Sequence, residues 1–197
     1  ELFRSASTWM AGAVARIFRP GCKFDYCLIL AGAQGVGKST FFEVLAGEWY
    51  NGNLSAMSSD KASLEQLRGS WVFEIQELDG MKRREASQVK AFITNCVDKY
   101  RGAYKEEVEE FPRQCVFGGT TNEATFLKDD TGERRFWPIK IEPEMRRVDD
   151  VRDALERDRD QIWAEAVKAF RDGQLLRLTG EMEGRMAEWC KSFSLAE

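Results

Sequence analysis

Hydrophobic positions along the chain fall into short continuous runs and into segments with helical spacing. Four apolar runs, 26–31, 71–75, 114–122 and 136–141, predict buried strands. Helical spacing predicts helices at 2–18, 40–45, 60–68, 84–97, 151–170 and 181–193, and the polar stretch 47–59 predicts a loop with one short strand near 54–57. This order indicates an α/β fold, with a central parallel sheet, helices on both faces and small helical elements at both ends.

A glycine-rich segment joins the first predicted strand to the helical pattern after it. Residues 32–39 match the phosphate-binding loop pattern G-x-x-x-x-G-K-[ST] at every fixed position. Glycines let backbone N–H groups approach phosphate oxygens, and the helix N-terminus adds a positive dipole end. Lys38 can reach the β- and γ-phosphates of ATP, and the Ser39 hydroxyl can ligate Mg²⁺. The predicted ATP-binding residues are Gly32, Ala33, Gln34, Gly35, Val36, Gly37, Lys38, Ser39 and Thr40.

Carboxylates follow the second predicted strand. In phosphate-loop ATPases, one carboxylate at this place holds Mg²⁺ and a second polarises the attacking water. The usual pair is adjacent and acidic, but here the pair is Gln76-Glu77. We expect Glu77 to activate the water, and Asp79 and Glu74 are the candidates for the Mg²⁺ side. The structural alternative is an edge strand with solvated acids.

Polar residues also flank the third and fourth predicted strands. Asn122 ends the third strand, where its amide can contact the γ-phosphate or the attacking water, although asparagine is also a common turn residue. Arg134 and Arg135 precede the fourth strand. They form either a solvated turn or a clamp on the phosphates of a neighbouring subunit. With Lys38 and Glu77, these residues make up the predicted catalytic set.

A basic and aromatic segment follows the predicted helix 84–97. Extended residues on both sides of Gly102 suggest a hairpin or loop. Its cations can contact DNA phosphates, and its tyrosines can stack on bases. The predicted DNA-binding residues are Lys99, Tyr100, Arg101, Tyr104 and Lys105. The acidic run 106–110, which we expect to be solvated, offers the alternative that it only neutralises these cations.

Composition excludes several kinds of chemistry. None of the 197 residues is histidine, which removes Ser-His-Asp and Cys-His catalysis and any Cys/His zinc site. The five cysteines lack C-x-x-C spacing and are interpreted as reduced structural thiols of a cytosolic protein. A net charge of −4 requires a local basic patch for any DNA contact. No apolar run is long enough to span a bilayer. Because the chain begins at Glu1, we expect a fragment of a longer protein.

Together, the motifs resemble the virulence-associated E family of phage and genomic-island proteins, which look like superfamily 3 helicases within the AAA+ ATPases. The segments that carry the resemblance are 31–40, 74–80, 98–101 with Tyr104, 119–122 and 132–138. Motif-level similarity covers about residues 9–141, and the C-terminal helices match more loosely. Gln76 departs from the acidic pair that is common in such ATPases.

The resemblance implies a ring-shaped homo-oligomer, a hexamer, with ATP between subunits and a DNA-engaging hairpin in the central channel. Lys38 and Ser39 match the first motif of the family, and Glu77 matches the second. Asn122 matches the sensor, and Arg134 or Arg135 matches the arginine finger. A primase-like region often precedes such a domain. We therefore expect 1–22 to end a helical subdomain, 23–145 to form the ATPase core and 146–197 to form C-terminal helices.

The sequence favours an ATP-dependent helicase or translocase domain of a mobile-element replication protein, acting on single-stranded or forked DNA. Two alternatives stay open. One is a small-molecule kinase with the same loop, and the other is a nucleotide-gated assembly module without turnover, which the amide at position 76 permits. A GTPase is disfavoured, because no N-K-x-D-like motif that would read guanine is present.

Overall fold

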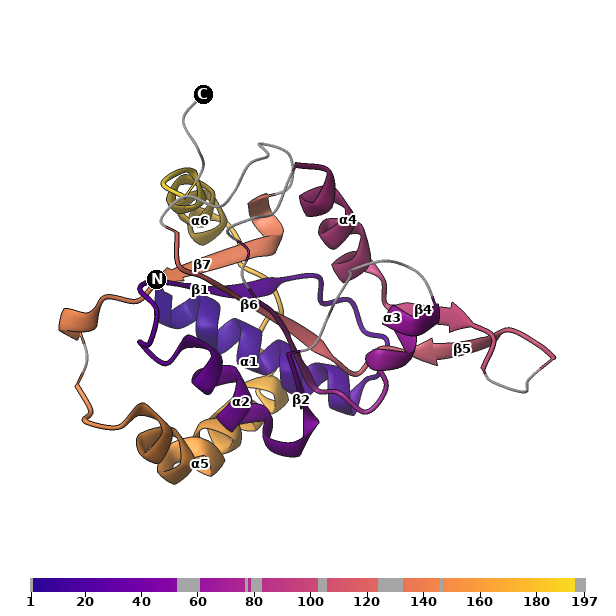
Figure 1. Ribbon diagram of the computed structural model, residues 1–197, viewed down its shortest axis with the longest axis horizontal. Helices are drawn as coiled ribbons and strands as arrows, with labels where there is room; N and C mark the ends of the chain where they lie inside the picture. The colour runs from indigo at the N-terminus through magenta and orange to yellow at the C-terminus, as the bar shows by residue number, and fades with distance from the viewer. Residues whose placement is uncertain are drawn as a thin grey trace.

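A five-stranded parallel sheet, in the order β2-β3-β6-β1-β7, lies at the centre of the molecule (Figure 1). The computed structural model describes residues 2–52, 61–76, 78, 83–102, 106–123, 133–145 and 147–193. The sheet strands are β1 Cys27–Ala31, β2 Tyr50–Asn51, β3 Val72–Ile75, β6 Val116–Thr121 and β7 Phe136–Lys140. The α/β fold with a central parallel sheet is thus confirmed.

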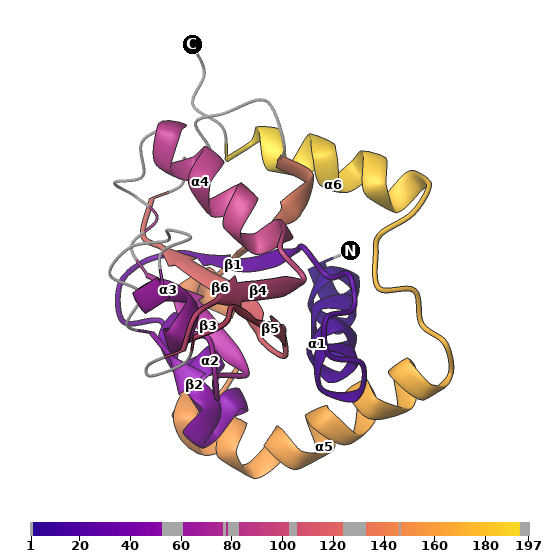
Figure 2. The same cartoon turned by 90° about the vertical axis from the view of Figure 1, so that its right-hand side faces the viewer.

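Helices cover both faces of the sheet (Figures 1 and 2). On one face lie α1 Leu2–Phe18, α2 Lys38–Ala46 and α5 Val151–Arg171, and on the other lie α4 Arg83–Thr94 and α6 Glu181–Lys191. The short helix α3 Lys61–Gln66 lies near the hairpin formed by β4 Val97–Tyr100 and β5 Glu109–Pro112. Short 3-10 turns span Gly47–Trp49, Glu133–Arg135 and Pro143–Met145. Every described helix is too short or too polar to cross a lipid bilayer.

The central strands β1 and β6 are buried along their whole length, because strands cover their edges and helices cover their faces. Small residues in β6 let the helices approach closely. An added Cβ at Gly118 would lie 2.4 Å from the ring of Phe42 in α2. The indole of Trp9 in α1 donates a hydrogen bond to the carbonyl of Phe117 at 2.8 Å. These contacts fix α1 and α2 against the sheet.

Two local expectations are corrected by the structure. The helix predicted at 84–97 ends at Thr94, and β4 begins at Val97. The strand β2 at Tyr50–Asn51 was not predicted, because two residues are too few for a periodic pattern. The acidic run 106–110 is largely exposed, as expected, and its last two residues begin β5. The predicted short strand near 54–57 lies outside the described residues.

Candidate nucleotide-binding site

The glycine-rich loop connects β1 to α2 at the carboxyl edge of the sheet. Gly35 and Gly37 have φ angles of 82° and 91°, which glycine adopts without the strain that a Cβ would cause. An added Cβ at Gly32 would lie 2.4 Å from the carbonyl oxygen of Ile141. The helix α2 begins at Lys38, directly after the loop. A loop of this form at a helix N-terminus presents backbone N–H groups to an anion.

Lys38 lies buried inside this loop, with only 9% of its surface exposed. Its Nζ donates hydrogen bonds to the carbonyl oxygens of Gly32 and Ala33, at 2.6 and 2.8 Å. It also donates to Oδ1 of Asn122 at 2.9 Å. The loop lysine and the residue that follows β6 therefore meet, as the predicted catalytic set requires.

A fully buried carboxylate, Glu74 in β3, lies beside Ser39. Its Oε1 accepts hydrogen bonds from Ser39 Oγ at 2.7 Å and from Thr120 Oγ1 at 2.8 Å. Its Oε2 accepts a hydrogen bond from the hydroxyl of Tyr50. The Tyr50 hydroxyl in turn accepts from Nε2 of Gln76 at 3.3 Å. These donors offset the cost of burying a carboxylate, which would be large without them.

The environment of Tyr50 keeps its hydroxyl protonated. Burial raises the pKa of Tyr50 above its usual value, and the hydrogen bond and charge of Glu74 raise the pKa further. All of these effects disfavour the phenolate. The hydroxyl therefore stays a hydrogen-bond donor at neutral pH.

The oxygen donors at this place fit Mg²⁺. This ion prefers carboxylate, hydroxyl and phosphate oxygens, and in nucleotide sites it takes only one or two protein ligands. Ser39 and Glu74 supply such oxygens 2.7 Å apart. The described residues contain no group of three or more acidic or cysteine side chains that could hold a metal by themselves. Ser39 and Glu74 alone would leave most positions around such an ion to phosphate oxygens and water.

The structure brings together some of the predicted site residues and leaves others untested. Lys38, Ser39 and Asn122 converge at the carboxyl edge of the sheet. Of the carboxylates, Glu74 lies beside Ser39, whereas Glu77 and Asp79 lie outside the described residues and stay predictions.

Two residues of the site, Tyr50 and Thr120, were missed by the sequence analysis. Thr120 could have been found, because it lies two residues before Asn122 near the end of a predicted strand, and alternate residues share a face. Tyr50 carries no such signal. Its strand is only two residues long, and 24 positions separate it from Glu74.

The two predicted finger arginines, Arg134 and Arg135, lie at the end of the sheet where the parallel strands begin, opposite the end that carries the glycine-rich loop. They precede β7, which is parallel to β1 with Phe136 opposite Cys27. A five-residue strand is roughly 17 Å long, which separates them from the loop of their own chain. The Nε of Arg135 donates to Oδ2 of Asp25 at 3.3 Å, whereas the Arg134 side chain is exposed.

The predicted DNA-contact segment lies on the β4–β5 hairpin, which extends away from the sheet (Figure 1). Lys99 Nζ lies 2.5 Å from Oε1 of Glu110, and both side chains are exposed. Arg101 is also exposed. Tyr100, which we predicted to stack on a base, is 6% exposed, and its ring stacks on Phe111 within the hairpin. Tyr104 and Lys105 lie outside the described residues.

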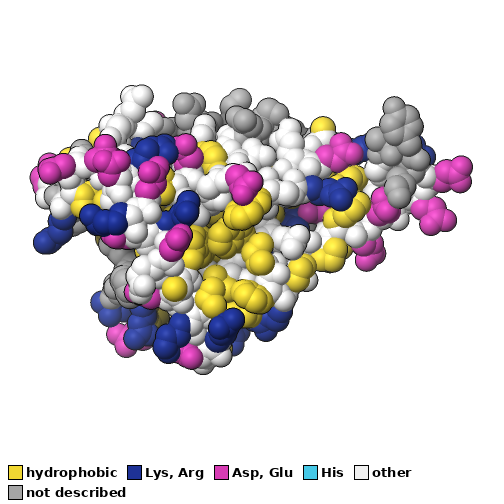
Figure 3. Space-filling model, turned by 90° about the horizontal axis from the view of Figure 1, so that it is seen from below, with side chains coloured by type: hydrophobic (Ala, Val, Ile, Leu, Met, Phe, Trp, Pro, Cys, Tyr) yellow, Lys and Arg dark blue, Asp and Glu magenta, His cyan; other side chains and the backbone are white. Residues whose placement is uncertain are grey.

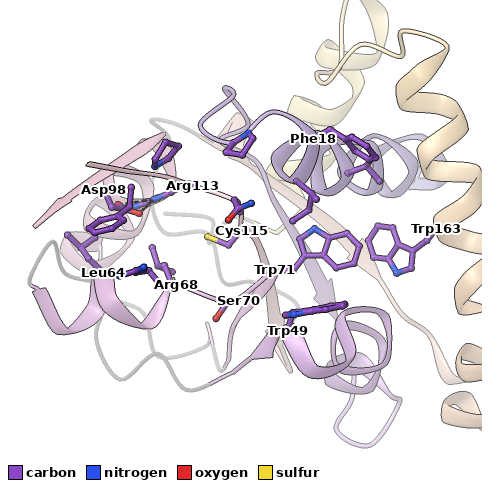
Figure 4. A pocket seen from close by; sticks show the side chains of 18 of the residues that line it. Phe18, Trp49, Leu64, Arg68, Ser70, Trp71, Asp98, Arg113, Cys115 and Trp163 are labelled. Carbon is purple, nitrogen blue, oxygen red and sulfur yellow. Dashed lines mark hydrogen bonds and ion pairs between the residues drawn. The ribbon is translucent and has the colours of Figure 1, made fainter. Parts of the chain in front are cut away.

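A separate apolar cavity of about 710 Å³ opens at the amino ends of the strands (Figures 3 and 4). Hydrophobic side chains gather on the face shown in Figure 3, and Ile17, Phe18 and Trp49 are exposed at the cavity. The rings of Trp71 and Trp163 stack inside it at 4.2 Å. The buried ion pair between Asp98 and Arg113 lines one end, with Oδ1 of Asp98 2.6 Å from Nη2 of Arg113. The cavity is therefore distinct from the nucleotide site at the other edge.

Comparison with known proteins gives a family and a fold. The family model of the virulence-associated protein E-like domain matches residues 3–194. A search of curated protein sequences gave no significant match. The chain is similar to an apo structure of the NrS-1 C-terminal region, with 16% identity, a TM-score of 0.56, and 95% of this chain and 48% of that chain covered. For the A form apo structure of that region, the identity is 14% and the TM-score is 0.60, with 96% of this chain and 47% of that chain covered. The chain thus spans about half the length of these structures.

Proposed function

We propose, from the premise that this chain belongs to the virulence-associated protein E-like domain family, that its core binds ATP with Mg²⁺ and hydrolyses it. The observation that carries the proposal is the convergence of three segments, the start of α2, β3 and the residue after β6, at one end of the sheet. There Lys38 meets Asn122 at 2.9 Å, and Ser39 meets Glu74 at 2.7 Å. This arrangement supports phosphoryl transfer, where catalysis depends on positioning and on charge stabilisation.

In the proposed site, the loop N–H groups bind the phosphates. Lys38 exchanges its carbonyl and amide acceptors for β- and γ-phosphate oxygens, which accept stronger hydrogen bonds because they are charged. Bound Mg²⁺ supplies charge neutralisation on the same phosphates. Ser39 holds the ion, and Glu74 orients the Ser39 hydroxyl by accepting its proton in a hydrogen bond. Asn122 then contacts the γ-phosphate or the attacking water, and Glu77 polarises that water.

We assign the finger arginines to a neighbouring subunit. Their position at the amino edge of the sheet keeps them away from the phosphate loop of their own chain. A guanidinium from a second copy would stabilise the charge on the transferring phosphoryl group. This assignment supports a homo-oligomer, and we propose the hexameric ring that the family resemblance implies. Arg134 is the better placed of the two, because Arg135 is engaged with Asp25.

We further propose that hydrolysis drives movement on single-stranded or forked DNA in the replication of a mobile element. The protruding hairpin supports this role, since it carries the exposed cations Lys99 and Arg101. A second candidate function is a nucleotide-gated assembly module without turnover. It is favoured by Gln76, whose amide donates to Tyr50 and which stands where such ATPases commonly carry an acid.

Phosphate release measured against protein concentration, with and without single-stranded DNA, tests the proposal. We expect Mg²⁺-dependent release that rises with concentration and with DNA. Lys38→Ala should weaken ATP binding and abolish release, because the charge on the β- and γ-phosphates is lost. Lys168→Ala is the matched control, since Lys168 is exposed and pairs with Asp172 near the end of α5. ATP binding without release would favour the assembly module, and absence of ATP binding would refute both functions.

A further inference from the structure

The chain of hydrogen bonds behind Ser39 extends beyond the residues that the proposed reaction needs. Ser39 donates to Glu74, Tyr50 donates to the other oxygen of that carboxylate, and Gln76 donates to Tyr50. Tyr50 is brought to this place because β2 pairs with β3 in parallel, with Tyr50 opposite Val72. An edge strand of two residues therefore delivers one hydroxyl to the buried carboxylate.

We infer that Tyr50, oriented by Gln76, is a positioning residue that fixes the Glu74 carboxylate against Ser39 and so sets the affinity of the site for Mg²⁺-nucleotide. The inference rests on the proposed function of the site. Tyr50 touches neither the reacting atoms nor the ion. It acts through Glu74, which acts through the Ser39 hydroxyl.

The chemistry of the phenol explains the amide at position 76. A tyrosine hydroxyl has one proton to donate and lone pairs to accept. The proton goes to Oε2 of Glu74, and Nε2 of Gln76 donates to a lone pair at 3.3 Å. A carboxylate at position 76 could not donate this hydrogen bond. It would also place a second negative charge near Glu74.

Gly52 keeps the space that this arrangement occupies. An added Cβ at Gly52 would lie 2.5 Å from the hydroxyl oxygen of Tyr50 and 2.8 Å from Nε2 of Gln76. Any larger residue would push these two groups apart. The absence of a side chain at Gly52 therefore allows the contact between the Tyr50 hydroxyl and the Gln76 amide.

The chain of hydrogen bonds from Gln76 through Tyr50 and Glu74 to Ser39, called the relay below, restricts how the Glu74 carboxylate can turn. Oε1 accepts from both Ser39 and Thr120, and Oε2 accepts from Tyr50, so both oxygens are held by donors on different strands and a helix. Loss of the Tyr50 hydroxyl would leave Oε2 without that donor in a fully buried position, which is costly. The carboxylate would then reorient, and the lone pairs of Ser39 would no longer face the ion.

The affinity for fluorescent ADP, titrated in Mg²⁺ and in EDTA, tests the inference without relying on turnover. For Tyr50→Phe we expect a loss of affinity of about tenfold in Mg²⁺, the lower end of what indirect metal partners contribute, and less than about twofold in EDTA. Tyr26→Phe is the matched control, because Tyr26 is also half-buried but stacks on Trp137, away from the loop. It should change neither value.

Gln76, which is exposed, provides a second variant that does not threaten folding. Gln76→Leu should weaken Mg²⁺-ADP binding by about threefold, and it should add nothing to Tyr50→Phe, because the two act through one path. Gln76→Glu should weaken binding at least as much as Gln76→Leu. Improved binding for Gln76→Glu would overturn the inference, as would equal losses of affinity for Tyr50→Phe in Mg²⁺ and EDTA.

The same titration distinguishes a failure of the Tyr50 inference from a failure of the proposed function. If the wild-type protein gains affinity from Mg²⁺ and Tyr50→Phe keeps that gain, the relay is refuted while the proposed function stands. If the wild-type protein gains no affinity from Mg²⁺, the proposed function fails, and the inference that rests on it fails too.

Discussion

At the scale of single residues, the candidate site depends on polar side chains that are buried and held by hydrogen bonds. Lys38 and Glu74 are charged residue types with 9% and 0% exposure, and such residues are rarely buried in a protein core without function or partners. The lysine contacts the loop and Asn122, the residue that follows β6, and the carboxylate contacts residues of α2, β2 and β6. The same end of the sheet therefore holds a buried ammonium group, which we propose to bind phosphates, and a buried carboxylate, which we propose to orient Ser39.

Glu77 should separate nucleotide binding from chemistry. Glu77→Gln is expected to bind ATP with nearly unchanged affinity but to hydrolyse it at least about a hundredfold more slowly, because a general base is lost. Asn122→Ala should have a similar but smaller effect. Single-turnover phosphate release, beside equilibrium ATP binding, measures both. Normal turnover in Glu77→Gln with slow turnover in Asp79→Asn would move the base to Asp79.

Tyr50 should make stability depend on alkaline pH. Burial, followed by the hydrogen bond to Glu74, raises the pKa of Tyr50 above its usual value of 10.0. The unfolded chain releases this proton near the usual value, whereas the folded chain keeps it. Stability from the protonated phenol is therefore complete below that value and is lost as pH rises above it. Urea denaturation between roughly pH 9 and 11 should show a steeper loss for wild type than for Tyr50→Phe. Parallel curves would contradict this expectation.

At the scale of elements, the sequence predicted what depends on local pattern. Continuous apolar runs predict four of the strands, because both faces of these strands are covered: β1, β3, β6 and β7. The sequence left open that the acidic run 106–110 neutralises the cations of the hairpin, but which acid meets Lys99 could not be predicted, since the pairing with Glu110 follows from the register of β4 and β5. The burial of Tyr100 follows from the same register, which brings its ring onto Phe111. The Tyr50 contact with Glu74 depends on the strand order β2-β3, which the pattern does not reveal.

The hairpin should carry the DNA contact through its cations. Replacing Lys99, Arg101 and Lys105 together with Ala should remove DNA stimulation and lower the salt slope of single-stranded DNA binding by up to about 2. A triple control at Lys61, Lys140 and Lys168 removes the same charge from exposed lysines that pair with acids elsewhere. Fluorescence anisotropy at several salt concentrations measures the slope. Equal slopes for the two triple variants would place the DNA contact outside the hairpin.

At the scale of the whole molecule, the two groups that the proposed reaction needs, the phosphate-binding loop and the finger arginine, lie at opposite ends of the strands of one sheet. The loop follows the carboxyl end of β1, and the arginine turn Glu133–Arg135 precedes the amino end of β7. A single copy cannot bring these ends together, because the paired strands between them are rigid and parallel. Two copies can, if the arginine edge of one faces the loop edge of the next. This arrangement requires a head-to-tail contact between copies. Such contacts form a closed ring when the rotation from one subunit to the next adds up to a full turn.

Mixing two inactive variants tests this arrangement. Lys38→Ala removes the phosphate contact of a chain but leaves its arginines, and Arg134→Ala does the reverse. In mixed assemblies, some interfaces pair an intact loop with an intact arginine, so phosphate release should recover part of the wild-type rate. Arg152→Ala serves as the control partner, since Arg152 is exposed and pairs with Glu43 at 2.8 Å. Its mixture with Lys38→Ala shows how much the rate of phosphate release changes when subunits with an intact loop and intact arginines are diluted with Lys38→Ala subunits. Full wild-type turnover by a monomer at high dilution would show that the arginine does not act in trans.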